Sequence, residues 1–544
     1  MFIFSKIGNS FSKALSSLIA IIIMLTQGSG IMLRGNIQNL LSVYSHSFYA
    51  STEKVNKYDA IKKEKSYTMY LAKNESENCQ FVMRARDDRH DSFIEIGEFK
   101  NEAGEILPSE ICKVCLVETD EGINGKKPDP LVPIEKRTEF SCASECNYIF
   151  LINVKSDKAT SAGDYTATIT FGNTGGDPKY EQSSAEIKAH VWNFELPDAF
   201  TMDTAMGLGK SDIAAQHGVD VNSPECLNLY IKYYNFLLEH GISAYNLPYD
   251  ILDSRADAYM SDPRVKSFCI PYGSDEMIKA YYDKLSTNNE WMKKAYFYPI
   301  DEPHSPENIE TYNNMCARLS RLFPGYNMVT PFYTNNIDGV AETNVDIQAG
   351  KSNIICPESV LFDEASFCET VRNRVASGDK VWWYVCCGPA PTSDYCNLFV
   401  QQEGIRHRIL FWQQKQYDVT GLLYWSTNYW CDTQNKDGVR TSPWNSAWST
   451  PWTGDDTYGD GSLLYPGNRI GINGPVSSLR LEAVLNGIED YEYLTMAEKL
   501  LGKKETDKII KKVSNNLTDY TYSDKTFENV RIELGNMLEK TMTK

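Results

Sequence analysis

The spacing of apolar residues changes once along the chain, near Pro197. Before it, short runs such as residues 165–171 alternate apolar and polar side chains, which is typical of half-buried strands. After it, apolar residues recur at helical spacing, as in residues 227–238, and apolar runs of strand length lie between the helical stretches. The 544 residues exceed the about 250 to 300 that one hydrophobic core usually organises. The chain therefore needs at least two domains of different architecture.

The first domain, residues 55–197, is predicted to be a β-sandwich. Its apolar-polar runs are separated by turn-rich segments such as residues 172–178, and no helical period interrupts them. Repeated short strands of this kind are typical of two packed antiparallel sheets. We find no catalytic constellation of residues in this part of the sequence.

The second domain, residues 198–500, is predicted to be a (β/α)8 barrel of TIM type, because strands and helices alternate regularly. A helix that opens at Ser477 and Ser478 would close the barrel, and residues 501–544 form a short helical tail. The predicted fold class is therefore multidomain β plus α/β. The eight predicted strands lie near 203–208, 243–247, 267–270, 295–300, 328–333, 353–357, 380–385 and 420–425.

The N-terminus has the features of an export signal. Two lysines precede an apolar run at residues 14–25, and small residues follow at 28–30. The run is shorter than the ~20 apolar residues of a spanning helix, which favours cleavage over anchoring. We expect residues 1–30 to be a signal peptide or N-terminal anchor and residues 31–54 a linker. The protein would then be secreted or at the cell surface, touching the membrane only through an uncleaved N-terminal segment.

Charge and aromatic content bear on the partner. Lys and Arg number 54 against 72 Asp and Glu, which gives a formal charge of −18, and no long basic stretch is present. Binding nucleic acid requires clustered Lys and Arg, so a nucleic-acid partner is not expected. The 10 Trp, 33 Tyr and 22 Phe offer ring faces that suit sugars as well as protein cores. The oligomeric state is not predicted.

The 14 cysteines do not follow a disulfide or metal-site pattern. Cys386 and Cys387 are adjacent in sequence, which is unfavourable for a bridge. Cys112 and Cys115 have the spacing of half a zinc ribbon, but the alternation of residues 110–117 explains both as strand residues. We expect most cysteines to be buried small apolar residues and no metal to be bound.

The fourth predicted strand of the barrel ends in two carboxylates, Asp301 and Glu302, and Pro303 follows. Catalytic side chains of such barrels lie at the C-terminal ends of strands. Neighbouring side chains on a strand point to opposite faces, so two carboxylates reach one ligand only where the strand gives way to a loop, as here. The structural alternative is that Asp301 caps the next helix and Glu302 pairs with a surface arginine.

Other strand ends combine aromatic and polar residues. Indole rings stack on the C–H faces of sugars, while amide and hydroxyl groups bind sugar hydroxyls. Trp382 and Trp383 must face opposite sides of their strand, so only one of them is expected to meet a ligand. The candidate substrate-binding residues are Asn246, Tyr249, Trp383, Tyr384, Trp425, Asn428 and Trp430.

Several segments of the chain form a recognisable set together with residues 301–303 (DEP). They are 72–80 (AKNESENCQ), 381–391 (VWWYVCCGPAP), 397–399 (NLF), 421–425 (GLLYW), 478–483 (SLRLEA) and 487–494 (GIEDYEYL). Asp-Glu-Pro alone is a weak motif, but the set is specific. Together these segments resemble glycoside hydrolase family 123 and the associated C-terminal domain of unknown function 4091, and the resemblance covers nearly everything from about residue 55 to 500.

The resemblance implies a β-N-acetylgalactosaminidase with an N-terminal β-sandwich and a (β/α)8 barrel. It implies a retaining, substrate-assisted mechanism in which Glu302 is the general acid/base and Asp301 orients and stabilises the 2-acetamido group of the sugar. The acetamido oxygen attacks the anomeric carbon and forms an oxazolinium ion, so no enzyme nucleophile is needed. The substrate would be a glycan or glycoconjugate, and no cofactor is required.

Three alternatives remain open at this stage. Asp301, Glu302 and His304 are residue types that bind a divalent metal for phosphoester hydrolysis, but the 7 histidines show no second ligand cluster. A hydrolase for another sugar shares the same motifs. A sugar-binding or surface protein on a hydrolase-like fold would also need stacking aromatics, and the intact carboxylate pair favours the enzyme over it.

Overall fold

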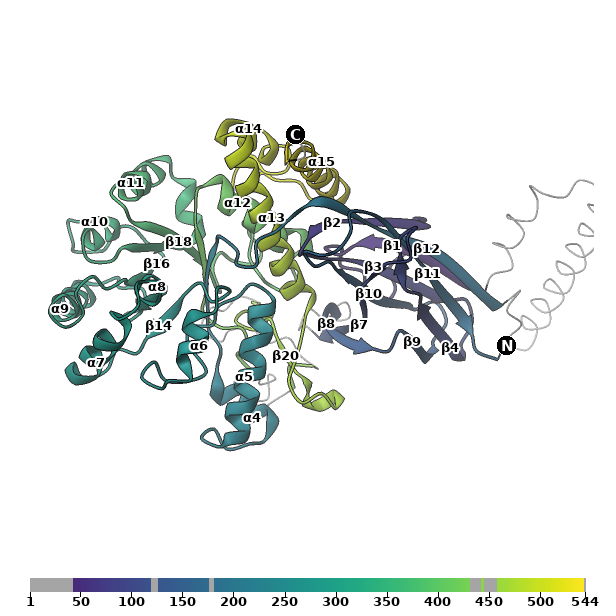
Figure 1. Ribbon diagram of the computed structural model, residues 1–544, viewed down its shortest axis with the longest axis horizontal. Coiled ribbons are helices and arrows are strands. Elements are labelled where there is room, and N and C mark those ends of the chain that lie inside the picture. Colours follow the sequence, from purple (N-terminus) through teal and green to yellow (C-terminus); the bar gives the residue numbers. More distant parts are fainter. Residues whose placement is uncertain (1–42, 119–125, 176–180, 431–441, 445–456, 543–544) are drawn as a thin grey trace, which may run out of the picture.

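The computed structural model describes residues 43–118, 126–175, 181–430, 442–444 and 457–542. The predicted signal segment at residues 1–30 lies outside this range. A β-rich N-terminal region and a mixed α/β region lie side by side, and the last helices pack where the two meet (Figure 1). Among the described residues, no helix combines the length and apolar character needed to cross a bilayer.

Two sheets make up the N-terminal region. They share one apolar core, in which Phe81 of the first sheet meets Phe171 of the second with ring centroids 5.3 Å apart. The first has the order β1 (Tyr44–Ala50), β3 (Ser76–Ala85), β10 (Asn147–Lys155), β7 (Ser109–Glu118) and β8 (Lys126–Ile134). The second has the order β2 (Ser66–Lys73), β12 (Gln182–Glu195), β11 (Gly163–Asn173), β4 (Arg89–Ile96) and β9 (Arg137–Cys142), with β5 (Phe99–Lys100) and β6 (Ile106–Leu107) at its side.

Strand structure begins earlier than predicted. β1 lies inside the range 31–54 that the sequence suggests as a linker, yet it pairs antiparallel with β3 from Tyr44 opposite Ala85 to Ala50 opposite Cys79. The pairing completes one edge of the first sheet, which local alternation does not reveal. Cys112 and Cys115 both lie on β7, as predicted.

The α/β region is built on parallel strands. Five form a sheet of order β13 (Asp203–Met206), β19 (Gly421–Tyr424), β18 (Lys380–Val385), β17 (Ile354–Pro357) and β16 (Val329–Phe332). Two more, β14 (Phe268–Ile270) and β15 (Ala295–Phe297), form a separate pair. A small antiparallel pair, β20 (Tyr465–Pro466) and β21 (Pro475–Val476), lies outside both.

Seven of the eight strands predicted for this region are therefore confirmed. The run 243–247 is not a strand and contributes only a bridge between Ala244 and Met206. A second bridge joins Phe297 of β15 to Met328 beside β16. A complete eight-stranded barrel is not confirmed, because the assigned parallel strands form a sheet of five and a sheet of two.

Helices surround the parallel strands (Figure 1). Many begin where a serine or threonine side chain accepts a backbone N–H in the first turn, as Ser223, Ser305 and Ser478 do. The helices are α4 (Lys210–His217), α5 (Pro224–Glu239), α6 (Ala256–Ser261), α7 (Asp275–Leu285), α8 (Asn289–Lys294), α9 (Pro306–Leu322), α10 (Asn344–Gln348), α11 (Ala365–Ala376), α12 (Gly404–Gln416), α13 (Leu479–Leu501), α14 (Lys503–Ile510) and α15 (Asp524–Met542).

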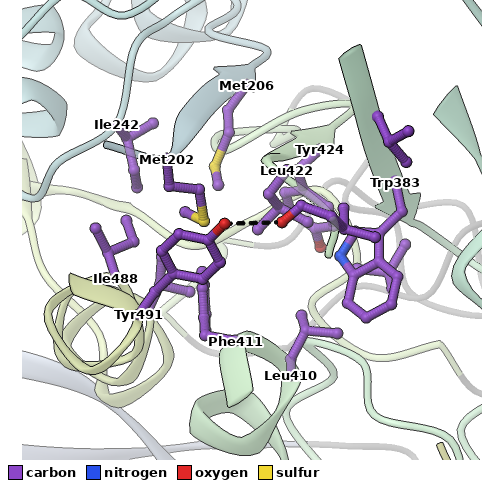
Figure 2. Close-up of a cluster of buried hydrophobic side chains, with 14 of the residues drawn as sticks. Met202, Met206, Ile242, Trp383, Leu410, Phe411, Leu422, Tyr424, Ile488 and Tyr491 are labelled. Atoms are coloured by element: carbon purple, nitrogen blue, oxygen red, sulfur yellow. Dashed lines mark hydrogen bonds between the residues drawn. The ribbon is translucent and has the colours of Figure 1, made fainter. Parts of the chain in front are cut away.

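A dense apolar core fills the space between these helices and the strands. Figure 2 shows Met206, Trp383 and Leu422 from the strands meeting Phe411 of α12 and Tyr491 of α13. The Tyr491 hydroxyl donates to the Val419 carbonyl oxygen at 3.1 Å, so the polar end of this ring is also satisfied. α13 opens at Ser478, as predicted, and is buried along most of its length.

A buried network of charges joins the two regions. Asp490 of α13 accepts from Arg408 of α12 and from Arg531 of α15, each at 2.7 Å. The same arginines reach the β-rich region, where both pair with Glu77 at 3.1 Å and Arg531 also pairs with Glu75. The predicted helical tail is thus helical, and α15 is fixed to the sheets by ion pairs as well as by packing against β12 and β2.

Asp490→Asn is expected to lower the free energy of unfolding by about 3 to 5 kcal/mol, because it leaves two buried guanidinium groups short of a counter-charge. Denaturant titration followed by fluorescence measures the change. The matched control is Glu290→Gln, which removes one partner of the exposed ion pair with Lys293 and should leave the transition where it is. Equal stability of Asp490→Asn and the wild type would contradict the structural role of the network.

Candidate active site

Asp301 and Glu302 lie on the loop after β15. The strand ends at Phe297, and α9 does not begin until Pro306. The side chain that caps α9 is Ser305, which accepts from the Asn308 N–H at 3.2 Å. Helix capping therefore does not explain Asp301. The two carboxylates follow the fourth predicted strand, as expected, but that strand ends at Phe297, three residues earlier than predicted.

The backbone of Glu302 is unusual. Its φ is +42°, in the left-handed region that a residue with a Cβ rarely adopts. Backbone strain of this kind costs of order 1 to 3 kcal/mol and is concentrated at functional sites. The strained residue is one of the two adjacent carboxylates, so the strain lies within the candidate site.

Each carboxylate has a tyrosine partner. The Tyr298 hydroxyl donates to Asp301 Oδ1 at 2.6 Å, and the Tyr384 hydroxyl of β18 donates to Glu302 Oε1. Asp301 is exposed, whereas Glu302 is half-buried. Burial raises the pKa of Glu302, the charge of Asp301 raises it further, and the hydrogen bond from Tyr384 opposes the rise. The loop therefore presents one exposed carboxylate beside a half-buried one whose pKa is raised.

Tyr384 reaches the site because successive side chains of β18 point to opposite faces of the sheet. Trp382 and Tyr384 point to the interior cluster with Tyr296 and Leu423, while Trp383 points to the helices. Tyr384 is the one predicted substrate-binding residue that the structure brings into contact with the catalytic candidates.

Glu358 is a third carboxyl group at the site, and the sequence analysis missed it. It directly follows β17 and forms a parallel bridge with Tyr384. Burial, together with the nearby charge of Glu302, raises the pKa of Glu358 to about 7. Glu358 directly follows the sixth predicted strand, residues 353–357, so inspecting the end of that strand as well would have found it.

Asp460 is a fourth acidic group, in a loop far along the chain. It accepts from the Trp425 indole N–H at 3.0 Å and from the Tyr424 hydroxyl at 3.2 Å. Burial raises the pKa of Asp460 to about 6. No strand precedes Asp460, so no sequence signal pointed to it. Its contact orients Trp425, whose half-buried ring remains a candidate for stacking on a sugar.

Three predicted substrate-binding residues are wrong. Trp383 is fully buried among core side chains (Figure 2). Asn428 is also buried, and its amide accepts from the Gly209 N–H at 2.7 Å and donates to the Gly209 carbonyl at 2.9 Å. Trp430 packs against Tyr233, and its N–H donates to Ser462 and Leu464. All three side chains serve packing and loop structure.

The remaining two candidates stay predictions. Asn246 is exposed at the end of the second predicted run, and its carbonyl accepts from the Tyr230 hydroxyl at 2.8 Å. Tyr249 is half-buried and packs between Tyr259 and the Arg255 guanidinium, which lies 4.2 Å from its ring centroid.

His304 does not join the carboxylates as a ligand. Its Nδ1 lies 2.7 Å from the backbone oxygen of Glu302, so the ring is held by the loop itself. Within the described ranges, no three His, Cys, Asp or Glu side chains are grouped as metal ligands. Cys386 and Cys387 lie beside the site with their sulfur atoms 3.7 Å apart.

Two comparisons with known proteins point to the same family. Residues 230–497 match the family model of the glycoside hydrolase 123 catalytic domain. A family 123 glycoside hydrolase from Clostridium perfringens superposes with a TM-score of 0.63 at 14% identity, over 91% of this chain and 97% of that one. A β-D-glucuronidase of Dictyoglomus thermophilum gives a TM-score of only 0.30 at 9% identity, over 81% of this chain and 68% of that one. No curated protein sequence matches the chain.

The protein is a glycoside hydrolase. It carries the catalytic domain of glycoside hydrolase family 123, and the paired carboxylates after β15 lie within the matched residues. The family resemblance seen in the sequence is thus confirmed.

Tyr384→Phe should move the pH–rate profile. The Tyr384 hydroxyl stabilises the ionised form of Glu302, so its removal raises the pKa of Glu302. The limb of the profile that Glu302 controls is then expected at higher pH than in the wild type. The control is Tyr312→Phe, which removes a buried hydroxyl bonded to Ser352 away from the site. A limb that stays in place in Tyr384→Phe would show that Glu302 does not govern it.

Proposed function

We propose that the protein is a retaining glycoside hydrolase that removes β-linked N-acetylgalactosamine from glycans by substrate-assisted catalysis. The observation that carries the proposal is the adjacent pair Asp301 and Glu302 on one strained loop, with unequal burial and separate tyrosine partners. A general acid must carry a proton, whereas a carboxylate that stabilises positive charge must be ionised. Unequal burial of two carboxyl groups favours this difference in protonation.

In the first step Glu302 gives its proton to the glycosidic oxygen as the bond to the anomeric carbon breaks. The acetamido oxygen of the same sugar forms the new bond to that carbon, which yields an oxazolinium ion and the free alcohol. Asp301 accepts a hydrogen bond from the acetamido N–H and offsets the positive charge. Water then adds to the anomeric carbon while the Glu302 carboxylate takes its proton, so the acid is restored and the configuration is retained.

We infer that the parallel strands belong to one (β/α)8 barrel. The bridge from Phe297 to Met328 supports this, because it joins the β14–β15 pair to the β16 edge of the five-stranded sheet, and the bridge from Met206 to Ala244 continues the other edge, at β13. The Tyr245 carbonyl, which accepts from the Cys269 N–H at 2.7 Å, supports it on the β14 side. In a barrel the loops after β15, β17 and β18 meet at one end, where catalytic groups lie.

The substrate class and the compartment also belong to this proposal. The Clostridium perfringens enzyme is described in connection with glycolipid glycan hydrolysis. A glycan carried on a lipid or protein is accordingly the substrate we propose here. The charged, apolar and small-residue order at residues 1–30 supports action outside the cytoplasm, as a secreted or cell-surface enzyme.

An aryl β-N-acetylgalactosaminide is expected to be cleaved, while the matching aryl β-galactoside is essentially inert because it lacks the acetamido nucleophile. Release of the aryl alcohol measures both rates, and an aryl β-N-acetylglucosaminide tests the sugar itself. Comparable turnover of the galactoside would exclude substrate assistance. Preference for the glucosaminide would assign a different sugar, and binding of all three without hydrolysis would favour a sugar-binding protein.

Substitution of each carboxylate should lower the rate of hydrolysis in a different way. Glu302→Gln removes the proton donor, so a substrate with a poor leaving group should lose far more rate than one with an activated aryl group. Asp301→Asn keeps the donor but removes the charge facing the oxazolinium, so both substrates should slow by similar factors, by analogy about 100- to 1000-fold. Steady-state rates on two leaving groups decide the matter. An equal fractional loss on both substrates in Glu302→Gln would mean that Glu302 is not the general acid.

A further inference from the structure

Glu358 occupies a position that neither proposed role explains. It follows β17, two strands from the loop that carries Asp301 and Glu302. Its backbone is bridged to Tyr384, the residue that bonds Glu302. Burial raises the pKa of Glu358, and the charge of Glu302 raises it further, so the two carboxyl groups lie close enough to interact. Glu358 and Glu302 therefore border the same space from the ends of β17 and β15, the strands on either side of β16.

The Glu358 carboxyl group lies close to the segment after β18. Its Oε1 lies against the position that a Cβ on residue 388 would take, and the glycine at that position leaves this space open. A larger residue there would push the flexible carboxyl group aside. The glycine therefore lets the Glu358 carboxyl group stay beside Tyr384 and Glu302.

Nothing in the described protein satisfies this carboxyl group. Its side chain is partly buried, yet it forms no hydrogen bond and no ion pair with any described residue. By contrast, Asp301 and Glu302 each accept a tyrosine hydroxyl. A partly buried carboxylate without protein donors has lost part of its hydration, and hydroxyl donors of a ligand replace what it has lost.

We propose that Glu358 is a substrate-binding residue, whose carboxylate accepts hydrogen bonds from ring hydroxyls of the sugar that Glu302 acts on. Two oxygens of one carboxylate match the spacing of neighbouring hydroxyls on a pyranose, so Glu358 would select sugars by the orientation of that pair. The inference rests on the proposed function only in placing a sugar beside Glu302. It does not depend on which bond the enzyme cleaves.

The test is a set of coupled binding measurements that need no turnover. Titration calorimetry gives the Kd of N-acetylgalactosamine and of its 3-, 4- and 6-deoxy analogues for the wild type, Glu358→Gln and Glu358→Ala. Removing the hydroxyl that faces Glu358 should weaken wild-type binding about 10- to 100-fold, the range for hydrogen bonds to charged groups. In Glu358→Ala the parent sugar should bind correspondingly more weakly, and removing that hydroxyl should cost nothing further.

The control is Glu364→Gln, which removes an exposed carboxylate from the same connection between β17 and α11. It should keep wild-type affinities for all four sugars. A thermal melt is run beside each titration, and Glu358→Gln, with its unchanged shape, replaces the alanine variant if the latter is unfolded. Glu358→Gln should lose less affinity for N-acetylgalactosamine than Glu358→Ala does. The change in its deoxy-sugar affinities should again concern only one or two hydroxyls.

Two results would overturn the proposal. One is that removing a hydroxyl from the sugar weakens binding equally in the wild type and in both Glu358 variants. Glu358 would then act only through its charge on Glu302 and not by binding the sugar. The other is a wild type that binds none of N-acetylgalactosamine, N-acetylglucosamine or galactose. The proposed hydrolase function is tested separately. It is wrong if the affinities for the deoxy sugars depend on Glu358 but no aryl glycoside is hydrolysed.

Discussion

Two arginines and three carboxylates, buried together at the junction of sheets and helices, set the relation between the halves of the molecule. Arg408 and Arg531 share Asp490 and reach across to Glu75 and Glu77. Each charge is excluded from water, so each depends on the others for compensation. A shift of α13 or α15 would separate opposite charges that water cannot reach. The network therefore holds the sheets, α12, α13 and the C-terminal helix in one arrangement.

The active site depends on that arrangement indirectly. α13 packs behind the strands, and its Tyr491 lies in the same core as Trp383 of β18 (Figure 2). β18 in turn carries Tyr384 to Glu302. Because core side chains are close-packed, small displacements behind a strand are passed to its end. The acidity of Glu302 is thus tied to packing on the opposite face of β18.

Acidic groups of the site differ because their surroundings differ. Asp301 is exposed, Glu302 is half-buried next to it, and Glu358 lies near Glu302 without a donor. Burial disfavours the charged form, and a neighbouring negative charge disfavours it again. These two effects raise the pKa of Glu302 and of Glu358. At Asp460, which accepts the Trp425 indole N–H, burial alone raises the pKa.

Local sequence determined the strands, most of their positions and the place of Asp301 and Glu302, because strand periodicity and a proline after two carboxylates are readable within ten residues. It could not decide which face of β18 meets the site, so both Trp383 and Tyr384 were assigned to the ligand, whereas the structure directs Tyr384 to Glu302 and Trp383 to the core. Asn428 finds its partner at Gly209, and Asp460 meets Trp425 through a loop, by contacts that no local pattern encodes. Only the tertiary structure brought Glu358 beside Glu302, because the ends of separate strands become neighbours only after the sheet has formed.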